Sequence, residues 1–91
     1  MLTLKLVREL LCNEADMISQ NKNKEIIIRK GYFYKHGQTA DMFAARISAI
    51  LTRKLILFET LEITDNWVPF KGGATLVSKQ SHFLVRLKGL K

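Results

Sequence analysis

The fold is decided by residues 25–54, which read EIIIRKGYFYKHGQTADMFAARISAILTRK. The first ten of these residues are rich in β-branched and aromatic side chains, which favour a pleated strand, so we expect a strand over 25–34. Gly31 interrupts this strand, and we expect a bulge or a close backbone approach there. Gly37 then allows a tight turn, and Thr39 followed by Asp41 is typical of the start of a helix.

A helix is predicted from residue 40 to about residue 54. Four apolar residues recur at helical spacing and form one stripe that faces the core: Phe43, Ile47, Ile50 and Leu51. A second face carries Arg46 and Arg53, two turns apart, with the small Ala45 and Ala49 beside them. Such a face allows the close approach of a partner, and it is also typical of an ordinary solvated surface.

The N-terminal segment is predicted to form another helix, over roughly 3–19. Its apolar residues follow helical spacing: Val7, Leu10, Leu11, Met17 and Ile18. Residues 19–24, SQNKNK, show no periodicity and are interpreted as a polar connector whose lysines could contact phosphate.

The C-terminal half is predicted to consist of strands and turns. Residues 57–64 alternate and indicate a half-buried strand that ends at the turn pair Asp65-Asn66. The strand-like residues 67–70 include Pro69, which cannot donate to a sheet ladder and therefore belongs at an edge or in an irregular crossing. Gly72-Gly73 makes a further turn, and the last strand, 81–88, has one apolar face and one basic face.

This order of elements predicts an α+β fold in which two helices pack on one face of a three- to four-stranded, mainly antiparallel sheet. A length of 91 residues suits a single domain, 1–91, with one modest core. The apolar runs are too short to span a membrane, and the N-terminus does not read as a secretory signal. The single Cys12 cannot form an internal disulfide, so we expect a reducing, cytoplasmic location. Because the apolar runs are short, we expect no membrane partner.

The net charge of +7 is unevenly distributed along the chain. Residues 22–35 carry five basic and one acidic side chain, residues 55–66 carry three acidic and no basic ones, and residues 67–91 carry five basic and no acidic ones. Such segregation predicts a positive surface that attracts polyanions, above all nucleic acid or a nucleoprotein surface.

No cofactor or metal site is expected from the motifs. Cys12, His36 and His82 are too few and too far apart in sequence to predict a metal centre, and Lys71-Gly72-Gly73 lacks the spacing of a phosphate-binding loop. Residues 35–39, KHGQT, precede the predicted helix, where free N–H groups could hold a phosphate; a plain capped turn is the alternative.

Ribonuclease chemistry is the enzymatic alternative. His82 with Ser81, Arg86 and Lys88 could supply a base, a hydroxyl and cations around a phosphate. Ser81-His82-Phe83 resembles the strand of HicA-type toxins, small basic ribonucleases whose catalytic histidine follows a glycine-serine pair, although here Lys79-Gln80 precedes it. That resemblance implies catalysis by His82.

We expect binding to nucleic acid or another partner through basic and aromatic residues that converge on one side of the molecule. Aromatics interleaved with cations over 29–35 could stack exposed bases, or could simply pack in the core. The candidate binding residues are Arg29, Lys30, Tyr32, Tyr34, Lys35, His36, Arg46, Arg53, Lys71, His82, Arg86 and Lys88.

In length, basicity, single cysteine and absence of catalytic motifs, the chain resembles small proteins of phages and mobile elements, including anti-CRISPR inhibitors that dock on CRISPR nucleoprotein complexes. The resemblance implies a non-enzymatic inhibitor that acts by occupying its target. The primary hypothesis is therefore a basic binding module for nucleic acid or a nucleoprotein complex. The alternatives are a ribonuclease using His82 and a homo-oligomeric scaffold that assembles through Trp67, Phe70 and the edge near Pro69.

Overall fold

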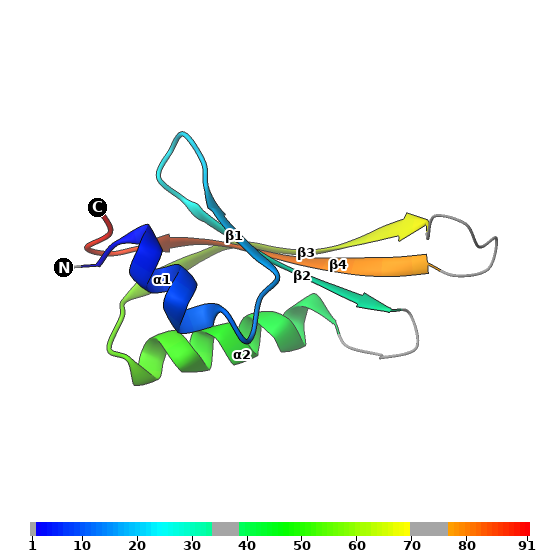
Figure 1. The fold of residues 1–91 in the computed structure, drawn as a ribbon, viewed down its shortest axis with the longest axis horizontal. Coiled ribbons are helices and arrows are strands. Elements are labelled where there is room, and N and C mark those ends of the chain that lie inside the picture. The colour runs from blue at the N-terminus through cyan, green and yellow to red at the C-terminus, as the bar shows by residue number, and fades with distance from the viewer. Residues whose placement is uncertain (1, 34–38, 70–76) are drawn as a thin grey trace.

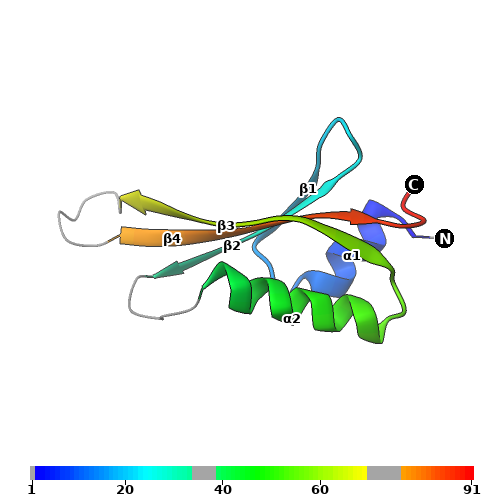
Figure 2. The same cartoon turned by 180° about the vertical axis from the view of Figure 1, so that it is seen from behind.

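The computed structural model describes residues 2–33, 39–69 and 77–91. These residues form α1 (Leu4–Leu11), β1 (Met17–Gln20), β2 (Ile26–Phe33), α2 (Ala40–Arg53), β3 (Phe58–Pro69) and β4 (Val77–Leu87). The strands make one sheet in the order β1-β2-β4-β3, and each neighbouring pair is antiparallel. Both helices lie on one face of the sheet, which confirms the predicted α+β architecture (Figures 1 and 2). Neither helix has the length and apolar character needed to cross a membrane.

The core fills the space between the helices and the sheet. Phe43, Ile47 and Leu51 of the predicted stripe are fully buried, whereas Ile50 is only partly buried. Thr39 caps α2, because its hydroxyl accepts a hydrogen bond from the Met42 N–H. α2 also contributes the buried Ala44, and the rest of the core comes from α1 and the sheet: Val7, Leu11, Ile18, Ile26, Ile28, Phe83, Val85 and Leu87.

The first helix is shorter than predicted, because it ends at Leu11 and residues 17–20 form a strand. Hydrogen bonds made by two polar residues, Asp16 and Asn21, explain the difference. Asp16 accepts a hydrogen bond from the Gly31 N–H at 2.8 Å, and its own N–H donates to the Arg29 carbonyl at 2.9 Å. The side-chain oxygen of Asn21 accepts from the N–H groups of residues 23 and 25, so it orders the turn into β2. These bonds favour a strand pair over a continued helix.

The bulge or close backbone approach expected at Gly31 is not found there. β2 pairs with β4 from Ile26 to Phe33 without a register shift. A Cβ atom at Gly31 would meet only an Asp16 oxygen at 3.6 Å, which is an ordinary contact. The bulge is in β3, between Thr60 and Glu62. The bulge reverses the alternation of side chains along β3. Two residues on either side of it that strict alternation would place on opposite faces of the sheet therefore lie on the same face.

Asp65-Asn66 is not a turn, because β3 continues through it to Pro69. The Asp65 carboxylate accepts a hydrogen bond from the buried Ser81 hydroxyl at 2.8 Å and another from the Ala40 N–H at 3.1 Å. It thereby connects β3, β4 and the positive N-terminal end of α2. Pro69 lies in the edge strand, as its missing N–H predicts.

The C-terminal end of α2 contains a strained residue. The Leu55 N–H donates to the Thr52 carbonyl at 3.0 Å, and the Ile56 N–H donates to the Leu51 carbonyl at 2.9 Å. This pattern is the Schellman motif, in which glycine normally occupies the left-handed position. Leu55 occupies it here with φ of 60°, and its side chain is 89% exposed. A non-glycine residue in this conformation costs about 1 kcal/mol or more.

Leu55→Gly is therefore expected to stabilise the fold by about 1 kcal/mol, raising the melting temperature by roughly 4–8 °C. The matched control is Leu55→Ala, which removes most of the same side chain but keeps the strained backbone, and it should leave stability within about 0.5 kcal/mol of wild type. Thermal unfolding followed by circular dichroism measures both. An equal rise for the two variants would show that strain at residue 55 is not the cause.

Candidate ligand-binding site on the open sheet face

The face of the sheet opposite the helices carries a row of facing side chains from all its strands. Arg29 of β2 lies directly opposite His82 of β4, and the row continues with Met17 of β1 and Thr64 of β3. Residues directly opposite one another in antiparallel strands point to the same side. The adjacent buried residues of β2 and β4 face the helices, so Arg29 and His82 face away from the core.

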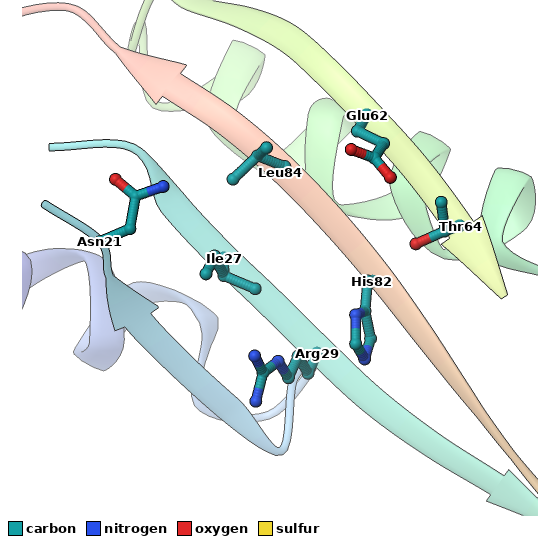
Figure 3. A pocket seen from close by; sticks show the side chains of 7 residues that line it. All are labelled: Asn21, Ile27, Arg29, Glu62, Thr64, His82 and Leu84. Atoms are coloured by element: carbon teal, nitrogen blue, oxygen red, sulfur yellow. The ribbon is translucent and has the colours of Figure 1, made fainter. Parts of the chain in front are cut away.

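A hollow of about 180 Å³ lies on this open face. Ile27 and Leu84, which are also paired across β2 and β4, give it an apolar floor. Figure 3 shows the Arg29 and His82 side chains on neighbouring strands, with Glu62 and Thr64 on the β3 side. The complete lining is Asn21, Ile27, Arg29, Glu62, Thr64, His82 and Leu84.

His82 is held in its neutral form. Its pKa lies below the ordinary value of 6.5, first because burial disfavours the imidazolium and second because the Arg29 charge repels it, while Glu62 opposes the shift. The Asn66 amide nitrogen lies 3.4 Å from Nδ1 of the ring. Because an amide N–H can only donate, Nδ1 is assigned as the acceptor and Nε2 carries the proton. Nε2 is buried and has no hydrogen-bond partner among the described residues.

Arg29 presents a second buried donor beside the imidazole. Its Nε has no hydrogen-bond partner in the described part of the chain, and Nη1 makes only a long contact of 3.8 Å with the Met17 sulfur. A buried N–H without an acceptor is costly, so a ligand would relieve both costs if the two side chains turned these nitrogens toward acceptor atoms placed in the hollow. The hollow is therefore suited to a ligand that combines an apolar surface with oxygen or ring-nitrogen acceptors.

A second cation on the open face, Arg86, is already neutralised. Arg86 donates to Glu59 at 2.7 Å and to Glu25 at 3.1 Å. No described carboxylate forms an ion pair with Arg29. Arg29 is consequently the open-face guanidinium that can take a new anionic partner.

Among the described residues, the basic side chains do not converge on one side of the molecule as predicted. Arg29 and Lys30 are consecutive in β2, so the pleat sends their side chains to opposite faces, and Lys30 lies opposite Ser81 on the helix side. Arg46 and Arg53 lie on α2 in the helix layer, where Arg46 pairs with Glu14 at 3.6 Å. Lys88 follows the end of β4. The charge is distributed over several surfaces.

Some candidate residues lie outside the described part of the chain, namely Tyr34, Lys35, His36 and Lys71, as does the proposed phosphate turn over 35–38. Tyr32 belongs to β2 and pairs with Lys79, but its side chain is not described. Five residues of the hollow were not predicted: Asn21, Ile27, Glu62, Thr64 and Leu84. The alternation within 25–34 and 81–88 would reveal some of them once the register between these strands is known.

The arrangement shows no sign of a metal centre in the part of the chain that is described, because no three His, Cys, Asp or Glu side chains gather there. Its chemistry is that of two N–H donors, a carboxylate, a hydroxyl and an amide around an apolar floor. Such groups bind and orient a ligand directly.

The neutral state of His82 makes folding sensitive to pH. Its pKa is lower in the folded than in the unfolded chain, so the unfolded state takes up the proton first as the pH falls. The free energy of unfolding should therefore be fully retained above about pH 7 and should decrease below about pH 6.5. Urea titrations of wild type and His82→Gln across this range measure the effect, which should be weaker in the variant. An NMR titration that placed the ring pKa at or above 6.5 would contradict it.

Comparison with known proteins gives no family assignment. The chain matches no protein-family model, no curated protein and no solved structure. Its function is therefore inferred from the chemistry of its own residues.

Proposed function

We propose that the protein is a non-enzymatic binding module that docks on single-stranded nucleic acid, free or displayed by a nucleoprotein complex, through its open sheet face. The observation that carries this proposal is a pair of buried donors, Arg29 Nε and His82 Nε2, which have no partner among the described residues and lie beside an apolar floor. A nucleotide supplies what this hollow lacks, because it combines a flat apolar base with phosphate, carbonyl and ring-nitrogen acceptors.

The side chains around the hollow favour an unpaired base. Ile27 and Leu84 can contact the flat face of a base, and the guanidinium and imidazole planes can stack on it or donate to its edge. Asn21 and Thr64 add groups that both donate and accept, and Glu62 accepts from exocyclic amino groups. In a duplex these edges are paired, so a splayed single strand fits better.

The charge of the open face limits how many phosphates it can hold. Arg86 is occupied by Glu25 and Glu59, so a second phosphate would approach carboxylates as well as a cation. We expect about one or two phosphate contacts and a salt slope near −1 for a single strand, much shallower than the net charge of the chain suggests. Recognition would rest on the base as much as on the phosphate.

The proposed setting is the cytoplasm, which the single Cys12 supports. Small size and a shallow site suit a protein that acts by occupancy, covering a strand that another factor must reach. An inhibitor that occupies an exposed strand of a CRISPR surveillance complex would be one such protein.

Arg29→Gln should weaken binding to a fluorescent single-stranded RNA or DNA 12-mer by about tenfold, because it removes the charged donor of the hollow. Arg53→Gln is the matched control, since it removes the same charge from the exposed helix layer, and it should change affinity by less than about twofold. Fluorescence anisotropy at several salt concentrations measures both affinity and slope. Equal weakening by the two variants, or a salt slope steeper than about −4, would mean that diffuse charge and not the open face binds the strand.

Ribonuclease activity is the second candidate, and one observation favours it. A neutral imidazole beside a guanidinium is suited to accept a proton next to a bound phosphate when the Asn66 side chain turns its oxygen toward Nδ1, because Nδ1 then carries the ring proton and Nε2 is free to accept. If His82 is a general base, purified protein should cleave RNA. His82→Gln should then lower the cleavage rate by at least about a hundredfold while retaining the wild-type circular dichroism spectrum. RNA that stays intact after long incubation with wild type would eliminate this candidate and leave the binding proposal in place.

A further inference from the structure

We propose that the protein has a second binding site, for the surface of an anionic lipid bilayer, at the turn that follows α2. We name this site the basic tip, and it consists of Arg53, Lys54, Leu55, Leu57 and Lys88. It lies at the end of the molecule where α2 passes into β3 and where β4 ends (Figure 1). The open-face hollow has none of these residues in its lining, so the two sites are separate.

The apolar part of the basic tip consists of two protruding leucines. Leu55 is 89% exposed and Leu57 is 68% exposed, so neither side chain contributes appreciably to the core. Leu55 also occupies a left-handed position where glycine is favoured. A large apolar side chain is thus exposed to solvent at a backbone position where a non-glycine residue is strained. The Leu55 side chain does not stabilise the fold, so we infer that it is buried against a binding partner.

Cations surround the two leucines. Arg53 and Lys54 precede them directly and are exposed. Lys88 is also exposed, and its N–H donates to the Leu57 carbonyl at 2.9 Å, so it is adjacent in space. The sequence has no acidic residue between Asp41 and Glu59 and none after Asp65. Glu59, the nearest carboxylate along the chain, is bonded to Arg86. Glu14 lines a hollow together with Arg53 and Lys54, but it is paired with Arg46 at 3.6 Å.

This combination favours a bilayer over other anionic partners. A nucleic acid backbone would pair with the cations but would leave the leucines in water. An acidic protein would need a pocket shaped for two protruding side chains. The interface of a bilayer accepts such side chains without shape complementarity, while anionic headgroups attract lysine and arginine. The contact is peripheral, because neither helix of the described structure can cross the membrane. It revises the expectation that the protein has no membrane partner.

The test is co-sedimentation of the full chain with phosphatidylcholine vesicles, with or without one quarter phosphatidylglycerol. Wild type should bind only the anionic vesicles. Leu55→Ala and Leu55→Gly should each weaken that binding roughly tenfold, because both remove the inserted side chain. Lys54→Gln should weaken it roughly fivefold. The control is Met42→Ala, which removes an apolar side chain of similar size that is 56% exposed at the other end of α2 and should bind like wild type.

Leu55→Gly keeps the test interpretable, since this variant is expected to be more stable than wild type and its loss of binding cannot come from unfolding. Absence of binding to anionic vesicles, or equal binding by wild type and both Leu55 variants, would overturn the proposal. Binding of an acidic amphipathic peptide in place of vesicles, lost in both Leu55 variants, would also overturn it and would identify a protein as the occupant. Arg29→Gln should leave vesicle binding unchanged, so this result is independent of the proposed function.

Discussion

The pairing of β2 with β4 beneath α2 is the constraint on which the rest of the structure depends. Ile26 and Ile28 of β2 and Phe83 and Val85 of β4 are fully buried on the helix side. Because side chains alternate along a strand, this burial also fixes what the other face carries. A slip of one residue would expose the core positions, so the register is strongly determined. The juxtaposition of Arg29 and His82 is thus a consequence of the core, and no separate interaction is needed to create it.

The same alternation explains why the described cations of this strongly basic chain do not gather on a single face. The side chains of two consecutive cations in a strand point to opposite faces of the sheet. Carboxylates on the same face form ion pairs with some of these cations, as Glu25 and Glu59 do with Arg86. The described residues still offer two surfaces of different character. The open face offers few charges with directed, unpartnered donors, which favours recognition of a particular group. The basic tip offers undirected charge beside protruding leucines, which favours a fluid, anionic surface.

Local signals predicted the elements that are determined locally. The strand near 26–33, the cap at Thr39 and the buried stripe of α2 each depend on residues within a few positions of one another. Prediction was wrong where a distant partner decided the outcome. Residues 17–20 satisfy helical spacing, yet they pair with β2. Asp65 looks like a turn residue, yet its carboxylate bonds Ser81 and Ala40, which are 16 and 25 positions away. Chain-distant hydrogen bonds of this kind leave no local pattern.

Local patterns were sufficient to predict the α+β class and the position of α2, to restrict Pro69 to an edge or an irregular crossing, and to name Arg29 and His82 as candidate binding residues. That these two side chains share a hollow floored by Ile27 and Leu84, and that Lys30 does not join them, follows from how the strands pair in the folded chain. The neutralisation of Arg86 is likewise a property of the folded chain. The reason is that propensity, capping and periodicity act over a few neighbouring residues, whereas a site on a sheet is assembled by strand register. The register is set by the burial of the opposite face, a property of the whole fold.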